Sequence, residues 1–372
     1  MKNLFGNYVY PVATLAGSII GVGFLSLPFI TLKVGFWPMI FYCAALIPLV
    51  VFIHVIFGKI CVATPDFKRW PGFVGYYFGS NAKKIMSFLM IAGSFGVLLV
   101  YLIIGSQFLT AIFSPIFGGS QVNYLLLYFF FASTLIFFGV KIISKFDFWA
   151  LVFLVASLVA IFIEGYGKIK LHNILVPFSG QFSNLFLPYG AIMFSLWGTG
   201  LIPETEEMVP GRKKSLRKII IISILIPAVI YLLFIFLILG ISGSSTTESA
   251  LLGLKDFLGG PIISIALFIG VITTFTCFIN QGLLLKKVFI YDMGLKEFPA
   301  WVLVCWVPLI LFFLGFNSFI ALISFVGGVL LSIEGILILL MYKKIGGNKI
   351  IIYPLAIFFI VGIIYSIVYF VK

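Results

Sequence analysis

The sequence predicts an all-α membrane protein of eleven transmembrane helices, two of which are interrupted near the middle of the membrane. The first reason is composition: 62% of the residues are hydrophobic and 9% are charged, whereas soluble domains carry about 25% charged residues. The mean hydropathy is +1.25. The second reason is a series of long apolar runs, and the third is a concentration of glycine and proline in the first and sixth runs.

Eleven apolar runs meet or approach the length of about 20 residues that a membrane-crossing helix requires. They cover residues 9–31, 37–57, 85–109, 122–140, 148–163, 185–208, 219–241, 261–284, 300–316, 318–340 and 350–371. We expect a single transmembrane domain over residues 1–372, with a first repeat at 9–163, a second repeat at 185–340 and an extra helix at 350–371. The first run is too long for a cleavable signal peptide and lacks an A-x-A site.

Basic residues in the loops predict the orientation. If the N-terminus is cytoplasmic, 19 of the 24 Lys and Arg residues lie in cytoplasmic segments and 5 lie outside. This bias predicts a multi-pass protein of the plasma or inner membrane, with a cytoplasmic N-terminus and an extracellular C-terminus. The net charge of +13 therefore serves as a topology signal, and we expect no nucleic-acid partner because the basic residues do not cluster on a folded surface.

Two loops carry further signals. The loop at 58–84 is expected to contain a short interfacial helix, and the outer loop at 242–260 is expected to fold back toward the bundle as a lid, because residues 251–258 are apolar. The four cysteines have no metal-ligand spacing and are expected to be reduced residues of the core: Cys43, Cys61, Cys277 and Cys305.

The first run is interrupted at 16–29, where three glycines, two serines and a proline occur together: Gly17, Gly21, Gly23, Ser18, Ser26 and Pro28. Each glycine costs a helix up to about 1 kcal/mol relative to alanine, and proline costs about 3 kcal/mol. A freed backbone group in hydrocarbon costs several kcal/mol more unless protein or water satisfies it. We therefore expect a broken helix that lines a cavity. The alternative is a seam of small residues for helix packing, since Gly17 and Gly21 match the G-x-x-x-G spacing.

The sixth run repeats this feature, with Gly198, Thr199 and Gly200 near its centre and Pro203 one turn later. Runs one and six open two successive groups of five with opposite orientations, which predicts an inverted repeat. A pair of interrupted helices at corresponding places in two halves is the strongest sequence indication of a transporter site.

Helix ends at such a site carry about half an elementary charge each. We expect one half-helix of the first run to end near Gly17 and the next to begin near Gly23, and the sixth run to break between Trp197 and Gly200. The negative ends suit an ammonium group or Na⁺, and the positive ends suit a carboxylate. A zwitterionic α-amino acid matches this field without charged side chains, and Glu334 is the only acidic residue well inside a run.

Four stretches in order resemble motifs of the amino acid/auxin permease family. They are G-S-I-I-G-V-G-F-L-S-L-P-F (17–29), Y-L-I-I-G-S-Q-F (101–108), I-P-E-T-E-E-M (202–208) and F-V-G-G-V-L-L-S-I-E-G (325–335). The resemblance extends over nearly the whole chain and implies the leucine-transporter fold, with secondary transport of amino acids driven by H⁺ or Na⁺. The chain departs from the family at Ser106, where an acidic residue often stands.

The candidate substrate-binding residues lie mainly at the two interruptions: Gly17, Ser18, Gly21, Val22, Gly23, Tyr101, Phe194, Trp197, Gly198, Thr199 and Gly200. Backbone groups of the glycines are expected to bind the substrate, and Phe194 and Trp197 to flank it. Because aromatic residues make up 18% of the chain, a core role is an equal alternative for both, and packing is an equal alternative for Tyr101.

A Na⁺ site is implied by the resemblance, with carbonyls of Gly17, Ile20 and Gly270 and the hydroxyls of Thr273 and Thr274 as ligands. The alternative is that each threonine hydroxyl bonds to its own helix. Proton coupling stays open, and no cofactor is expected beyond this ion.

Glu334 and the two histidines lie outside the sets named above. Glu334 is an expensive residue inside a membrane and therefore a candidate for gating or proton transfer near the cytoplasmic end of its run, with a structural hydrogen bond as the alternative. The histidines His54 and His172 are isolated in the sequence, and no ligand role is expected for them.

Other classes of protein fit the sequence less well. An enzyme would need a nucleophile with a base, or a metal cluster, and a channel would need a repeated filter or a charged ring; the sequence offers none of these. The alternative that stays open is a non-transporting amino acid sensor of the same fold. We expect a monomer in the lipid bilayer whose small-molecule partner is a neutral or hydrophobic amino acid.

Overall fold

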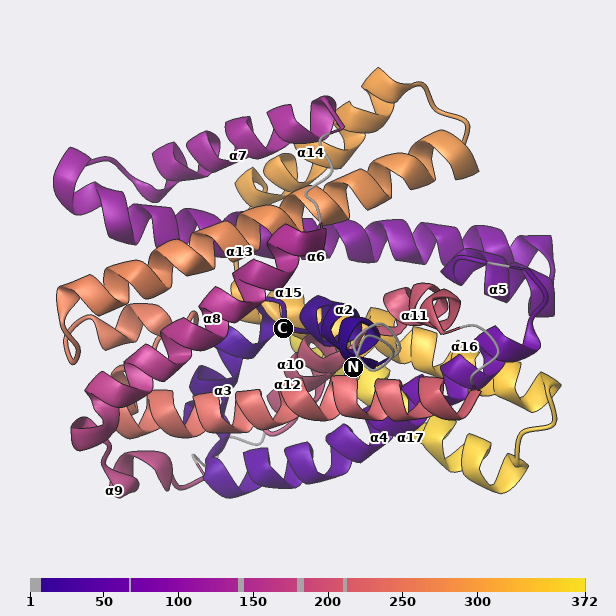
Figure 1. Cartoon of the computed structure of the whole chain (residues 1–372), viewed down its shortest axis with the longest axis horizontal. Helices are drawn as coiled ribbons and strands as arrows, with labels where there is room; N and C mark the ends of the chain where they lie inside the picture. The colour runs from indigo at the N-terminus through magenta and orange to yellow at the C-terminus, as the bar shows by residue number, and fades with distance from the viewer. Residues whose placement is uncertain (1–7, 67, 140–143, 179–183, 210–212, 372) are drawn as a thin grey trace.

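The computed structural model describes residues 8–66, 68–139, 144–178, 184–209 and 213–371, and within these residues every regular element is a helix (Figure 1). Six helices are long and apolar enough to cross a membrane, or seven if one bent pair counts as a single span. Two more, at Gln121–Phe137 and Glu297–Phe313, are apolar but shorter. The chain is therefore a multi-pass helical protein, while the count of eleven spans stays a prediction.

The helices coincide closely with the predicted runs. The first half consists of α2 (Tyr10–Ile19), η2 (Gly23–Ser26), α3 (Leu27–Val34), α4 (Phe36–Ala63), α5 (Trp70–Phe78), α6 (Ser80–Phe117), α7 (Gln121–Phe137) and α8 (Ser144–Gly165). Helix α5 lies in the loop where a short helix was predicted. Helices α4, α6 and α8 extend beyond their apolar runs at both ends.

The second half begins with short elements and then repeats the pattern of long helices. It consists of η3 (Tyr166–Lys168), α9 (Leu171–Ile174), α10 (Leu187–Leu196), η5 (Thr199–Leu201), α11 (Ile202–Met208), α12 (Lys213–Ser242), η6 (Gly243–Ser245), η7 (Leu251–Leu254), α13 (Gly260–Lys287), η8 (Val288–Asp292), α14 (Glu297–Phe313), α15 (Phe319–Phe325), η9 (Val326–Leu330), α16 (Leu331–Lys344) and α17 (Lys349–Val371). The apolar part of the outer loop is packed inward, since Leu251, Leu254 and Leu258 are buried and η7 packs on α12 and α13.

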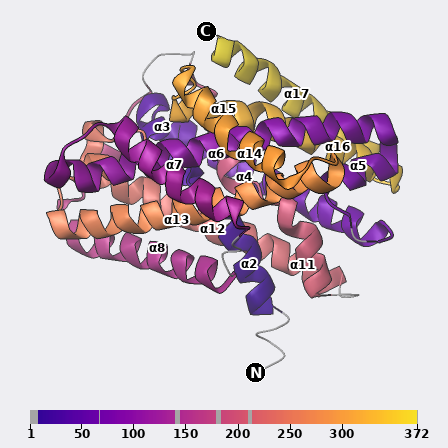
Figure 2. The same ribbon diagram turned by 90° about the horizontal axis from the view of Figure 1, so that it is seen from above.

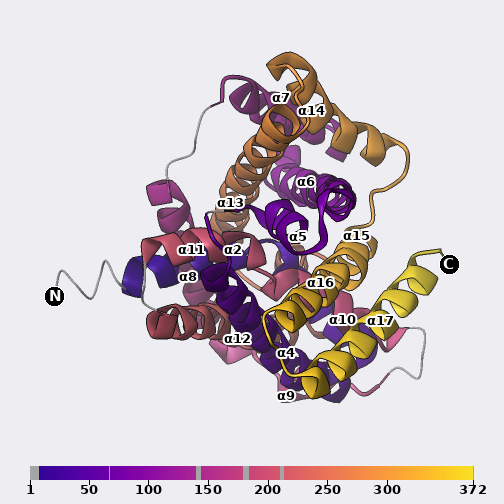
Figure 3. The same ribbon diagram turned by 90° about the vertical axis from the view of Figure 1, so that its right-hand side faces the viewer.

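Two groups of helices build two hydrophobic cores. Helices α6, α7, α13 and α14 enclose the smaller core, around Tyr128 and Phe278, and they lie together along one side of the molecule (Figures 2 and 3). The larger core joins α2, α3, α4, α10, α12, α15 and α16. Helix α10 lies inside this second group, where it packs against α4, α15 and η9. The interrupted helices are therefore enclosed by continuous ones.

Candidate functional site

The first interruption lies between α2 and α3, whose directions differ by 47° across the break. Helix α2 continues to Ile19, and Ile20 leaves the helical region with φ −76° and ψ 83°. The expectation that this half-helix ends near Gly17 is therefore wrong: Gly17 and Ser18 lie inside α2, and the Ser18 hydroxyl donates to the Leu15 carbonyl at 2.8 Å. A glycine costs a helix only about 1 kcal/mol, which the packing of α2 on α12 offsets.

The second interruption separates α10 from α11. Helix α10 ends at Leu196, and Trp197 has an extended backbone with φ −82° and ψ 121°. A single 3₁₀ turn, η5, then leads into α11 at Ile202. Both interruptions thus leave backbone groups outside regular helical hydrogen bonding, which is the condition for binding a ligand through the backbone.

The two interruptions pack into each other through glycine. A Cβ on Gly23 would lie 2.6 Å from Phe194 Cδ1 and 2.7 Å from Ser195 Oγ, and a Cβ on Gly198 would lie 2.5 Å from Ile19 Cγ1. At each break, a side chain of the other segment packs directly against the glycine. A larger residue at either glycine would clash with that side chain. This reciprocal contact joins α2–α3 and α10–α11 into one unit.

Tyr231 of α12 connects the ends of the two first half-helices. Its hydroxyl lies 3.1 Å from the Ile19 carbonyl and 3.0 Å from the Ser195 carbonyl, and its ring stacks on Phe24 with centroids 5.2 Å apart. The side chain is buried. Sequence reasoning missed this residue, because a tyrosine in an apolar run gives no signal of what its hydroxyl meets across 36 or 212 residues of chain.

His54 of α4 fixes the break in the sixth segment. Its Nε2 accepts the Gly198 N–H at 2.8 Å, and its Nδ1 lies 2.8 Å from the Val50 carbonyl. These partners require a neutral ring with the proton on Nδ1. The ring also meets the Trp197 indole edge-on, with centroids 5.0 Å apart. Nothing in the sequence assigns this isolated histidine to the interruption. Among the described residues, no group of three or more His, Cys, Asp or Glu side chains could hold a metal ion.

Glu334 of α16 completes the same arrangement from the opposite side. One carboxylate oxygen, Oε2, accepts the Trp197 indole N–H at 2.6 Å and the Thr199 hydroxyl at 3.1 Å. The gating or proton role of Glu334 stays a prediction beside the structural hydrogen bond, and the carboxylate contacts the broken part of the sixth segment. The π-helical turn η9 (Val326–Leu330) directly precedes α16.

The family model described as "Transmembrane amino acid transporter protein" matches residues 6–370. The chain belongs to this family. Comparison with curated proteins yields no match. Among solved structures, the chain is similar to Mhp1, a nucleobase-cation-symport-1 family transporter in a closed conformation with bromovinylhydantoin bound, with a TM-score of 0.65, 14% identity and coverage of 88% of this chain and 76% of that one. It is also similar to MhsT in complex with L-phenylalanine, with a TM-score of 0.55, 15% identity and coverage of 99% and 98%. Both are transporters of the leucine-transporter fold, and at these identities the likeness shows the fold.

Three of the transporter's remaining candidate residues, Tyr101, Val22 and Gly200, lie at or near the interruptions. Tyr101 of α6 lies beside the first interruption, with its hydroxyl 3.3 Å from where a Cβ on Gly21 would be. Val22 is buried at the same break, whereas Gly200 faces open space. Contacts therefore join Tyr101 to Gly21 and Phe194 to Gly23, while a shared binding role of these residues stays a prediction.

The residues of the predicted Na⁺ site are not brought together in this arrangement. The Thr273 hydroxyl donates to the Ile269 carbonyl and the Thr274 hydroxyl to the Val271 carbonyl, each at 2.9 Å. Their helix, α13, packs mainly on α6 and α8, while α2, which carries Gly17, packs mainly on α12. Gly270 faces Phe108. The Na⁺ site stays a prediction, and it requires α2 and α13 to approach each other.

Proposed function

We propose that this protein is a secondary active transporter that moves a neutral or hydrophobic amino acid across the membrane by alternating access, coupled to Na⁺ or H⁺. In this proposal the chain forms a 5+5 inverted repeat with a cytoplasmic N-terminus. The observation that carries it is the reciprocal packing of the two interruptions around Gly23 and Gly198. It places the ends of α2 and α10 at one point, where a single hydroxyl, that of Tyr231, meets both.

The substrate's two charges are assigned to opposite kinds of helix end. The ammonium group binds at the carbonyl ends of α2 and α10, near Ile19 and Ser195, where the helix dipoles are negative. The carboxylate binds the amide groups of Val22 and Gly23, at the start of the second half of the first segment, since the Gly21 N–H donates to the Ile19 carbonyl at 2.9 Å. Tyr101 and Phe194 flank the substrate. A neutral side chain fits best, because the groups gathered there are uncharged apart from Glu334.

The two candidate coupling ions use different residues. Na⁺ would bind the carbonyls of Gly17 and Ile20 with Gly270, Thr273 and Thr274 once α2 approaches α13, whereas H⁺ would bind Glu334. Thr274→Val removes one oxygen ligand and leaves a side chain of similar size. We expect the variant to need more Na⁺ for the same uptake if Na⁺ is the coupling ion. An unchanged response to Na⁺, with uptake that follows a pH gradient, would assign coupling to H⁺.

The decisive experiment is uptake of radiolabelled neutral amino acids into vesicles that contain the purified protein, under imposed Na⁺ and pH gradients. We expect accumulation above the external concentration under one of the gradients, with competition by unlabelled neutral amino acids. Saturable binding without accumulation under any gradient would instead identify a sensor of the same fold. Absence of both binding and uptake for all amino acids would contradict the proposal.

A further inference from the structure

A groove of about 320 Å³ lies between α4 and α12, near the residues where α4 ends and α12 begins. We call it the α4–α12 groove. Its lining residues are Val55, Gly58, Lys59, Val62, Ala63, Lys214, Leu216, Arg217 and Ile220. Most of the lining is apolar, and the two helices run side by side along the lower part of the molecule in Figure 1. The groove does not include any residue of the interrupted segments.

Three basic side chains surround this apolar groove. Lys214 and Arg217 are three residues apart on α12, so they point to the same side of the helix, and Lys59 lies across from them on α4. All three are exposed. Lys59 also lies over the Tyr342 ring, with its ammonium 5.7 Å from the centroid. No acidic residue lines the groove, and neither ion pair among the described residues involves these three cations.

The depth of the groove fits the boundary between hydrocarbon and lipid headgroups. The apolar run of α4 ends at residue 57, two residues before Lys59, and the apolar run of α12 begins at residue 219, two residues after Arg217. Val55 and Ile220 extend from this level into the apolar part of both helices. A molecule that fills the groove must therefore combine an anionic group with an apolar chain. Basic pockets between transmembrane helices bind the headgroups of anionic lipids for this reason.

We propose that the α4–α12 groove binds one anionic phospholipid, with its phosphate held by Lys59, Lys214 and Arg217 and the start of an acyl chain lying on Val55, Val62 and Ile220. A site of this kind differs from the general attraction of basic loops to the membrane, because it needs the cations and the hollow together. Cations that serve only as topology signals would extend into water and leave the groove without specificity.

The position of the groove gives the lipid an effect on transport, and this second step rests on the proposed function. Helix α4 carries His54, directly before Val55, and α12 carries Tyr231. These two residues bond to the interrupted segments at Gly198, Ile19 and Ser195. A lipid bound to both helices restrains their separation and so stabilises the arrangement of the interruptions. We expect faster uptake when the groove is occupied.

Binding is tested on the purified full chain in detergent by thermal unfolding with added dioleoylphosphatidylglycerol or dioleoylphosphatidylcholine. We expect phosphatidylglycerol to raise the unfolding midpoint by about 2–4 °C, with little change from phosphatidylcholine. The triple variant K59Q/K214Q/R217Q should lose this shift. The matched control K84Q/K218Q/K296Q removes three exposed cations outside the groove and should keep it. Equal shifts with both lipids, or equal loss in both variants, would overturn the proposal.

A second variant separates the hollow from the charges. Val62→Trp keeps all three cations and fills the groove, so the shift with phosphatidylglycerol should fall by more than half. Full retention of the shift would show that the groove is not used. Soluble glycerol phosphate is the control for the headgroup alone, and an equal shift with it would also contradict a lipid site.

Uptake provides the readout for regulation. In vesicles that contain phosphatidylglycerol, we expect uptake several-fold faster than in pure phosphatidylcholine, with the difference absent in K59Q/K214Q/R217Q and present in K84Q/K218Q/K296Q. The same rate in both vesicles would contradict the regulatory role. If the protein does not transport at all, the thermal shifts still decide whether the groove binds lipid, so the two proposals fail separately.

Discussion

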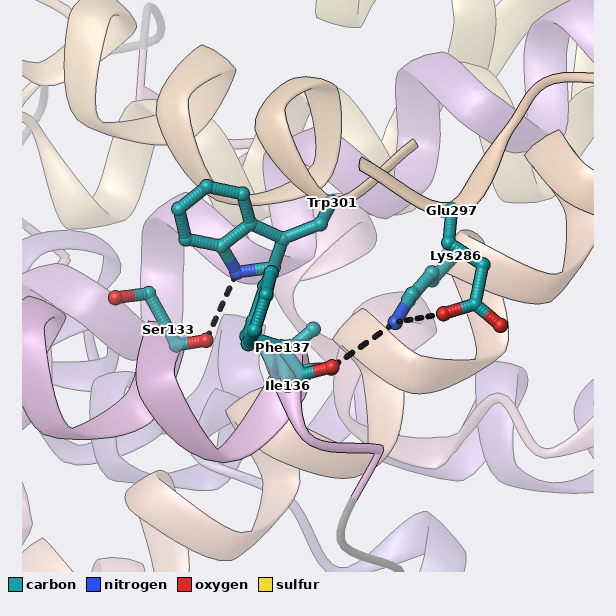
Figure 4. Close-up of polar contacts among 6 residues, drawn as sticks. All are labelled: Ser133, Ile136, Phe137, Lys286, Glu297 and Trp301. Carbon is teal, nitrogen blue, oxygen red and sulfur yellow. Dashed lines mark hydrogen bonds and ion pairs between the residues drawn. The ribbon is translucent and has the colours of Figure 1, made fainter. Parts of the chain in front are cut away.

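The carbonyl groups at the C-terminus of α7 have a cationic partner, whereas those at the C-termini of α2 and α10 have uncharged partners. At the end of α7, the ammonium of Lys286 lies 3.4 Å from the Ile136 carbonyl and 3.2 Å from the Phe137 carbonyl, and Glu297 approaches the same ammonium at 3.9 Å (Figure 4). Nearby, the Trp301 indole N–H donates to the Ser133 carbonyl at 2.9 Å (Figure 4). At the ends of α2 and α10, by contrast, the Ile19 and Ser195 carbonyls meet uncharged donors: both accept from the Tyr231 hydroxyl, and Ile19 also accepts the Gly21 N–H at 2.9 Å.

The difference lies in how much of the helix dipole is compensated. A permanent cation at a helix C-terminus stabilises it by about 0.3–1 kcal/mol, and by up to about 2 kcal/mol when partly buried. A tyrosine hydroxyl has one proton to donate and no charge, so it leaves most of the negative potential of α2 and α10 uncompensated. The end of α7 is therefore compensated by a cation, whereas the ends of α2 and α10 meet only uncharged donors. Under the proposed function, these ends receive the substrate ammonium.

The largest effect on uptake is expected from a larger side chain at Gly198, where the two interruptions pack against each other. Gly198→Leu places a side chain where Ile19 now lies, 2.5 Å from the position of Cβ, and overpacking of this kind costs about 1–3 kcal/mol. We expect uptake to fall by up to about 100-fold, measured as the initial rate in vesicles. Gly260→Leu, outside the interruptions, is the matched control, since nothing lies within 4 Å of its added Cβ. Equal loss in both variants would show that the contact is not specific.

The next effect concerns the carboxylate that meets the broken segment. Glu334→Gln keeps an oxygen for the Trp197 indole and the Thr199 hydroxyl but cannot carry the coupling proton. If H⁺ drives transport, we expect accumulation driven by a pH gradient to disappear, while exchange of internal for external amino acid continues. Counterflow measurements separate the two processes. Retained accumulation under the pH gradient would limit Glu334 to a structural role.

A smaller effect is expected at the shared hydroxyl. Tyr231→Phe keeps the ring that stacks on Phe24 and removes the donor to Ile19 and Ser195. A hydrogen bond contributes about 0.5–1.5 kcal/mol net, which corresponds to roughly 2- to 10-fold. We expect half-maximal uptake at a substrate concentration higher by this factor. Tyr8→Phe, which removes the bond to Ser215, is the control and should leave this concentration unchanged.

The smallest effect on uptake is expected at the cation-compensated end of α7. Lys286→Met removes the cation from the Ile136 and Phe137 carbonyls and should lower the free energy of unfolding by about 1–2 kcal/mol. Uptake per folded protein should stay the same, because α7 lies in the other helix group. Lys287→Met is the control in thermal unfolding. A change in substrate affinity with Lys286→Met would remove the distinction between the end of α7 and the ends of α2 and α10.

Local sequence predicted the positions of the helices well. The apolar runs coincide with long helices such as α4, α6, α12 and α17, and the short helix α5 was expected in its loop. Helix α10 ends at Leu196 and α11 begins at Ile202, around the glycines and proline that weaken a helix. The break in the first segment was misplaced toward Gly17 because propensity alone does not say which of several glycines leaves the helix, and packing of α2 against α12 decides this.

By itself the sequence determined the membrane class, the helices and the two weak points, because hydropathy and helix propensity act over a few turns of chain. Only the tertiary structure decided which side chains meet those weak points. His54, Tyr231 and Glu334 reach them from helices α4, α12 and α16, and each of these three contacts joins residues more than a hundred positions apart. Such partners depend on which faces of distant helices come together, and that depends on the packing of the whole bundle.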